Sequence, residues 1–142
     1  MDKVSKLFNF ASVMFSVVGG FVCQALGGWD VILESFVALV VIDYITGVLK
    51  AIYNKELSSA VGYKGIIKKV VYFIVIATAV VVQTVIQTVV GNKAPLREIT
   101  ILLFLYNEGV SILENASEFA PIPKKLKEVL IQLRDKADTK EW

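Results

Sequence analysis

The sequence has no histidine and only one cysteine among its 142 residues. A single chain therefore cannot assemble a zinc site of the usual Cys/His kind or form an internal disulfide bond. Catalytic sets built on Ser/His/Asp or Cys/His are excluded for the same reason, and no glycine-rich loop has the P-loop spacing. We accordingly expect no catalytic residues, no metal ion, no cofactor and no enzymatic activity.

A strong excess of one charge is also missing. The formal net charge is +2, so no basic field marks a nucleic-acid partner. Charged residues make up only 20% of the chain, whereas 56% of it is hydrophobic, and the mean hydropathy is +0.66. Because ordinary soluble domains are less apolar and more charged, this composition favours a membrane protein.

Four long apolar runs lie between the clusters of charged residues. They cover about residues 7–26, 29–49, 70–90 and 96–116, and roughly 20 helical residues cross the ~30 Å hydrocarbon core of a bilayer. A lone strand would leave backbone groups unpaired in lipid, so we expect these runs to be helices. We predict an all-α integral membrane protein with about four transmembrane helices, forming a single membrane domain over residues 1–142.

The first run is open to two other interpretations. Lys3 and Lys6 ahead of an apolar stretch also fit a signal peptide. However, no small-x-small cleavage site closes the stretch, and Val22 stands where a lipoprotein-type site at Cys23 would have a small residue. Polar residues such as Ser12 dilute the run, as in an amphipathic helix that lies on the membrane surface. We favour the spanning helix over the signal peptide.

The basic residues predict how the chain is oriented. The N-terminus, the 50–69 segment and the C-terminal tail are rich in lysine, whereas the 27–30 turn has no Lys or Arg and the 91–97 turn has only Lys93 and Arg97. Short cytoplasmic loops carry the excess of basic residues in membrane proteins. Four spans with both termini in the cytoplasm satisfy this rule at every loop.

Several polar side chains fall within the predicted spans, where a central charge costs roughly 2.5–3.5 kcal/mol on insertion scales. In the second run, Asp43, Thr46 and Gly47 share one helical face. Counting from the span boundaries places Glu108 of the fourth run at a depth similar to that of Asp43, in the inner half of the membrane. The fourth run carries a broad polar stripe made of Asn107, Glu108, Ser111, Glu114 and Asn115.

These eight residues permit two interpretations. They line a water-filled path or a subunit interface, or they form a structural polar seam between the helices of one chain. A bundle this small buries such a stripe poorly within one subunit, which favours a homo-oligomer. The eight residues are therefore our candidates for lining a pore or an oligomer interface.

Two groups of lysines are candidates for contact with the surface of the lipid bilayer. Apolar residues in the tail, residues 121–142, recur from Leu126 to Leu133 at i, i+3, i+4 and i+7. This spacing predicts a C-terminal amphipathic helix that is attracted to anionic lipid. The candidate lysines are Lys64, Lys68 and Lys69 at the end of the 50–69 segment, and Lys124, Lys125 and Lys127 in the tail.

Three motifs occur together in this order. They are VIDYITGVLKA at residues 41–51, NEGVSILEN at residues 107–115 and PIPKKLK at residues 121–127. The ordered set resembles the toxin-secretion/phage-lysis holin family, which includes clostridial toxin-export holins. The GGWD sequence at residues 27–30 and the segment at residues 62–69 are similar to that family as well, so the resemblance covers nearly the whole chain.

The resemblance implies a protein that accumulates in the bacterial cytoplasmic membrane, oligomerises and opens lesions. An endolysin, or a toxin, would leave the cell through these lesions without necessary direct contact, and host lysis would follow. Two alternatives stay open, a small membrane channel or transporter and an antiholin-type regulator. The family supplies no validated list of functional residues, so the candidate residues above rest on the membrane argument alone.

Overall fold

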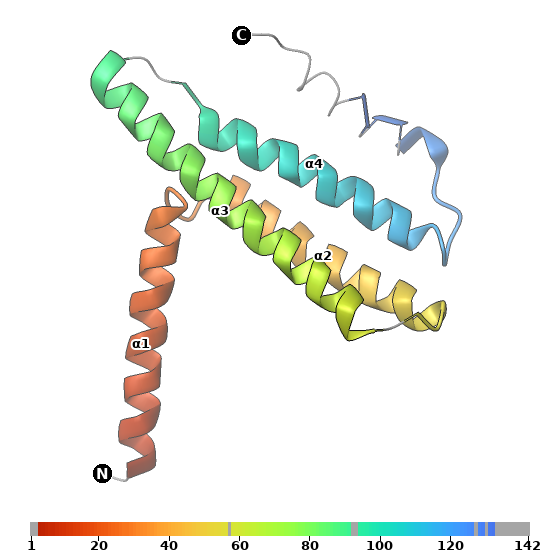
Figure 1. Ribbon diagram of the computed structural model, residues 1–142, viewed down its shortest axis with the longest axis horizontal. Coiled ribbons are helices and arrows are strands. Elements are labelled where there is room, and N and C mark those ends of the chain that lie inside the picture. The colour runs from red at the N-terminus through yellow and green to blue at the C-terminus, as the bar shows by residue number, and fades with distance from the viewer. Residues whose placement is uncertain (1–2, 57, 92–93, 127, 130, 133–142) are drawn as a thin grey trace.

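The computed structural model describes residues 3–56, 58–91, 94–126, 128–129 and 131–132. All regular structure in this part of the chain is helical, which confirms the all-α prediction. The long helices are α1 (Lys3–Ala25), α2 (Val31–Tyr53), α3 (Ser59–Val90) and α4 (Leu96–Ala116) (Figure 1).

The third helix begins well before the predicted run. The apolar run begins at residue 70, but α3 begins at Ser59. Lys64, Lys68 and Lys69 lie within this helix, as is compatible with lysine being a good helix former. The change from polar to apolar sequence therefore does not mark the beginning of the helix. By contrast, the bounds of α4 coincide with those of the fourth predicted run.

Three segments within the described residues are long and apolar enough to cross a membrane. They are Lys3–Ala25, Val31–Tyr53 and Gly62–Val90. The fourth predicted span, α4, has 21 residues but is more polar, and it does not meet this measure of composition. The helices are those of a membrane protein, and α4 differs from the others by being the least hydrophobic.

Helices α2, α3 and α4 lie side by side, whereas α1 extends away from them (Figure 1). Most of the contacts between helices are made by α4 with α2 and with α3, while α2 and α3 contact one another little. An ion pair between Lys50 and Glu118, 3.1 Å apart, joins the chain just after α4 to the last turn of α2. No residue of α1 is buried.

An apolar core fills the middle of the three-helix body. Phe36 is fully buried, and its ring lies 5.5 Å from that of Phe73 and 6.2 Å from that of Phe104. The Tyr72 and Phe104 rings stack with centroids 4.1 Å apart. Burial of such side chains stabilises a body that has polar groups at both ends. The buried core residues are Leu26, Leu33, Phe36, Val40, Tyr72, Ile76 and Ile101.

After α4, residues 117–123 form turns and irregular structure, and the described residues 124–126, 128–129 and 131–132 are helical. Lys124 and Lys125 are exposed. Leu126 and Val129, on the predicted apolar face, are also exposed. Lys127 and the rest of the predicted amphipathic helix from residue 133 onward lie outside the described residues.

Candidate functional site

An ion cluster joins the three packed helices at one level of the body. The Lys69 ammonium of α3 donates a hydrogen bond to Asp43 Oδ2 of α2 at 2.8 Å and another to Glu108 Oε2 of α4. The Glu108 side chain is completely buried, and the side chains of Lys69 and Asp43 are 12% and 14% exposed. Charges removed from water in this way need partners. Here the two carboxylates share one partner, the Lys69 ammonium.

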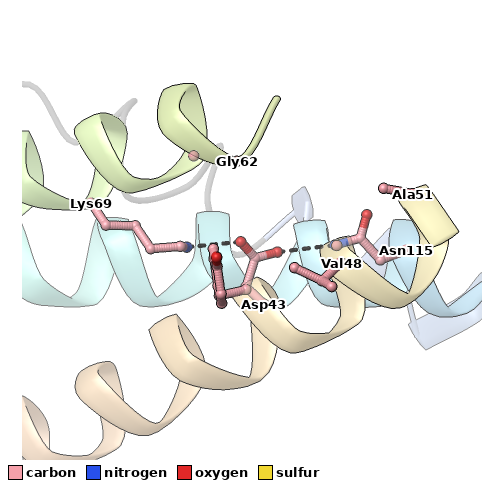
Figure 2. Close-up of a pocket in the computed structure, with 9 residues that line it drawn as sticks. Asp43, Val48, Ala51, Gly62, Lys69 and Asn115 are labelled. Carbon is pink, nitrogen blue, oxygen red and sulfur yellow. Dashed lines mark hydrogen bonds and ion pairs between the residues drawn. The ribbon is translucent and has the colours of Figure 1, made fainter. Parts of the chain in front are cut away.

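Asn115 extends this cluster along the seam between α2 and α4. Its side-chain amide nitrogen donates to Asp43 Oδ1 at 3.2 Å and to Thr46 Oγ1 at 3.3 Å. Figure 2 shows Lys69, Asp43 and Asn115 pointing toward one another from three helices. A Cβ at Gly47 would lie 3.6 Å from the same amide nitrogen, which is ordinary contact distance. The face of α2 predicted from sequence therefore packs against α4 and not against lipid.

The predicted polar stripe of α4 divides into two faces. Glu108 and Asn115 point into the three-helix body, whereas Asn107 and Ser111 are half-buried and Glu114 is exposed. At 100° per residue the second set lies about 90° around the helix from Glu108. In the part of the chain that the structure describes, neither the Asn107 amide nor the Ser111 hydroxyl has a hydrogen-bond partner.

The three lysines predicted at the membrane surface also divide. Lys64 and Lys68 are exposed, and Lys68 Nζ lies 5.5 Å from the centre of the Tyr72 ring. Lys69 differs from them, because its side chain is only 12% exposed and pairs with Asp43 and Glu108. It occurs three, four and seven residues before Tyr72, Phe73 and Ile76, so it shares the helix face that meets α4. The third run is apolar almost all round, so its sequence does not show which of the lysines shares this face.

A pocket of about 160 Å³ opens beside the ion cluster, between α2 and α3. Its polar lining comes from Asp43, Lys69 and Asn115. Three glycines, Gly47, Gly62 and Gly65, also line it, and their lack of side chains helps to keep the space open. The ion cluster is therefore reachable from outside the body through this pocket; Figure 2 shows the residues that line it.

A second ion cluster, which the sequence did not predict, surrounds Arg97. The guanidinium binds Asp30 with two hydrogen bonds, Nη1 to Oδ2 at 2.7 Å and Nη2 to Oδ1 at 3.1 Å. It also donates to the carbonyl oxygens of Leu26, at 2.6 Å, and Gly28, at 3.1 Å. Although charged, Arg97 is only 4% exposed. This fork geometry is one that arginine forms and lysine cannot.

The Arg97 cluster connects the α1–α2 turn to the beginning of α4 and to α3. The backbone N–H of Arg97 donates to Gln83 Oε1 at 2.8 Å. Asp30 also caps α2 by accepting from the Leu33 N–H at 2.9 Å. From its sequence position, Arg97 was predicted only to be a charge in the 91–97 turn. Only two of the 15 basic residues are arginines. The choice of arginine over lysine at position 97 was the sequence signal that could have pointed to this ion pair.

The two ion clusters lie at opposite ends of the apolar core. Along α2 and α4 they are separated by 13 and 11 residues (Asp30 to Asp43 and Arg97 to Glu108), or about 16–20 Å at 1.5 Å per residue. Because Asp30 pairs with Arg97 and Asp43 with Asn115, α2 and α4 run parallel, and α3 runs antiparallel to both. The body therefore has a polar layer, an apolar core and a second polar layer along its length.

Gly27 and Gly28 form the turn held by Arg97, and both have positive φ, +83° and +97°. An alanine at either position is strained by about 1–3 kcal/mol. At Gly27 the added Cβ would also lie 2.6 Å from Arg97 Nε, whereas at Gly28 it would meet open space. We expect Gly27→Ala to lower the melting temperature of the purified protein clearly more than Gly28→Ala. Equal losses would contradict a tight fit between Arg97 and the turn.

The Asp30–Arg97 pair also predicts a pH dependence. Hydrogen bonds from the Arg97 guanidinium hold the pKa of the Asp30 carboxyl below its ordinary value, with a smaller contribution from the Leu33 N–H. The ionised carboxylate thus stabilises the folded state above the ordinary pKa of about 3.9, and this contribution is lost as the pH falls through the lower folded-state pKa.

We therefore expect melting temperatures measured from pH 7 down to pH 2.5 to fall more steeply for the parent than for Asp30→Asn. The variant is less stable at pH 7 because it lacks the ion pair, so acidification removes less of its stability. Glu34→Gln, at an exposed position of the same helix, serves as the control and keeps the slope of the parent. If the melting temperatures of Asp30→Asn and the parent had the same slope against pH, the Asp30–Arg97 pair would not contribute to the stability of the fold.

These features define a helical membrane protein with two internal ion clusters. The chain matches the model of the bacteriophage holin family over residues 20–135, and it belongs to that family. This membership confirms the resemblance to phage-lysis holins and the prediction that the protein is not an enzyme, since the family consists of non-enzymatic membrane proteins. Most of α1 lies before the matched region.

Relatives occur in bacteria and in a phage. The chain is 32% identical to an uncharacterized 14.9 kDa protein in the nagH 3′ region of Clostridium perfringens, over 94% of this chain and 99% of that protein. It is 35% identical to Lmo0128 of Listeria monocytogenes, over 89% of this chain and 84% of that protein. It is 37% identical to a probable holin of Bacillus phage phi105, over 61% of each chain. No solved structure matches.

Proposed function

We propose that the protein is a holin of the bacterial cytoplasmic membrane, which oligomerises and opens lesions that release an endolysin, or a toxin, and so causes host lysis. Family membership supports this role. The observation that carries the proposal is the second polar face of α4. Asn107 and Ser111 lie there without hydrogen-bond partners among the described residues.

The physical argument concerns the surroundings of this face. Polar groups without partners are unfavourable against lipid, and the other packed faces of α4 are already occupied by α2 and α3. Water in a lesion, or the same face of neighbouring copies, would satisfy the Asn107 and Ser111 side chains. In this account Asp43, Glu108 and Asn115 hold the body of each subunit together, and the Asn107, Ser111 and Glu114 face lines the opening.

The proposal includes four crossings with both termini in the cytoplasm, as the positions of the basic residues predict. The antiparallel order of α2, α3 and α4 suits consecutive crossings of one membrane. This orientation places the exposed Lys64, Lys68 and Lys124 at the inner leaflet, where anionic lipids attract them. In this proposal the endolysin or toxin passes through the opening, and direct contact with the subunit is not necessary.

The test is inducible expression in bacteria that also make a cytoplasmic endolysin, with membrane potential and cell density followed over time. The double variant Asn107→Leu, Ser111→Ala removes the polar face and should accumulate in the membrane without lysis, or with clearly delayed lysis. Leu102→Ala, at an exposed apolar position elsewhere on α4, is the matched control and should lyse on the schedule of the parent. Lysis of the double variant on the same schedule would exclude this face from the opening.

A further inference from the structure

The ion cluster of Asp43, Lys69 and Glu108 has an unequal number of charges. Two carboxylates contact one ammonium. Lys68, the preceding residue of α3, is a second cation, but it is exposed, and its Nζ lies 5.5 Å from the centre of the Tyr72 ring. Tyr44 and Asn115, which line the adjoining pocket, are neutral groups. If both carboxylates were ionised, the seam between the helices would hold one uncompensated negative charge.

The position of Glu108 makes that charge costly. Its side chain is fully buried, and its Oε1 has no hydrogen-bond partner among the described residues. A carboxylate shielded from water needs partners at both oxygens, whereas a carboxylic acid carries no net charge. Asp43 has better support, since Lys69 binds one of its oxygens and Asn115 the other.

We propose that this cluster is a proton-binding site, in which one proton on the Glu108 carboxyl balances the cluster so that α3 stays packed against α4. The proton comes from water through the 160 Å³ pocket, where Asp43 and Lys69 are partly exposed. With Glu108 neutral, Lys69 and Asp43 form a one-to-one ion pair between α3 and α2. Loss of the proton leaves two carboxylates competing for one ammonium and weakens the contact of α3 with α4.

Infrared spectroscopy of the full chain reconstituted in liposomes tests this site, because a protonated carboxyl has a carbonyl stretch that carboxylates lack. We expect the parent at neutral pH to show the band of one protonated carboxyl and to lose it as the pH is raised. Because the folded site binds a proton that a solvated side chain does not, the melting temperature should fall over the same pH range.

Three variants assign the band. Glu108→Gln removes the carboxyl and should abolish the band. Asp43→Asn keeps Glu108 but leaves it as the sole partner of Lys69, so the charges balance without a proton and the band should also disappear. Glu114→Gln, at an exposed position of α4, is the control and should keep the band.

The infrared spectrum of the parent protein tests the proposal by itself. The proposal therefore stays testable even if a substitution prevents folding. A parent without a protonated carboxyl band at neutral pH would overturn the proposal. A band that persists in folded Glu108→Gln, or in folded Asp43→Asn, would overturn it as well. The measurement does not depend on lysis, so it stands apart from the proposed holin function.

Discussion

Lys69→Met is expected to prevent the protein from accumulating as a folded membrane protein. The substitution keeps the length of the side chain but leaves Asp43 and Glu108 facing one another without the ammonium that contacts both. Removal of one partner from a buried ion pair costs about 3–5 kcal/mol, which is a large part of the 5–15 kcal/mol that stabilises a typical folded domain. The amount of protein in washed membranes and its resistance to protease measure the effect.

A rescue experiment separates the loss of charge balance from the loss of the lysine itself. Adding Asp43→Asn and Glu108→Gln to Lys69→Met makes the cluster neutral with nearly the same shape, and it should restore most of the accumulation. Lys64→Met removes an exposed lysine from the same helix and should change stability by no more than about 0.5 kcal/mol. Normal accumulation of the single Lys69→Met variant would show that the cluster does not hold the three helices together.

Arg97→Ala has the second large expected effect, at the other end of the body. It leaves the Asp30 carboxylate and the carbonyl oxygens of Leu26 and Gly28 without their shared donor. We expect a loss of about 1.5–3 kcal/mol and a detached α1–α2 turn. The loss is smaller than for a fully buried pair because the Asp30 side chain is 46% exposed. Arg97→Lys restores the charge but not the fork, so it should recover only part of the loss.

The single cysteine reports on this turn directly. Cys23 is partly buried, and its carbonyl oxygen accepts a hydrogen bond from the Gly28 N–H at 2.9 Å. The rate at which a maleimide labels its thiol should increase clearly in Arg97→Ala and less in Arg97→Lys. Labelling at the rate of the parent in both variants would contradict the role of Arg97 as the group that holds the turn.

The sequence was sufficient to predict the helices, because apolar runs of about 20 residues report directly on membrane helices. It did not predict where α3 begins. Lysine ends an apolar run without ending a helix, so the change in hydropathy and the first turn of α3 are eleven residues apart, at residues 70 and 59. The polar residues that dilute the first run, such as Ser12, allowed a surface helix there, but they did not predict that α1 would lie apart from the other three helices.

The ion clusters were predictable only in part. The depth of Asp43 and Glu108 could be counted from the spans, and the structure brings both into contact with Lys69. Which of two neighbouring lysines points inward depends on the rotation of α3, and a residue count at the span boundary does not supply that rotation. Arg97 and Asp30 are 67 residues apart in the chain, so their contact arises from packing and not from local sequence.

The most direct test of the proposed function follows the membrane potential of bacteria that express the unmodified protein, with and without a cytoplasmic endolysin. We predict normal growth and potential during accumulation, then sudden depolarisation in both cultures, and rapid lysis only where the endolysin is present. Steady accumulation with an intact potential and no release of endolysin would contradict the holin proposal, and it would favour a regulator of another holin or a small channel.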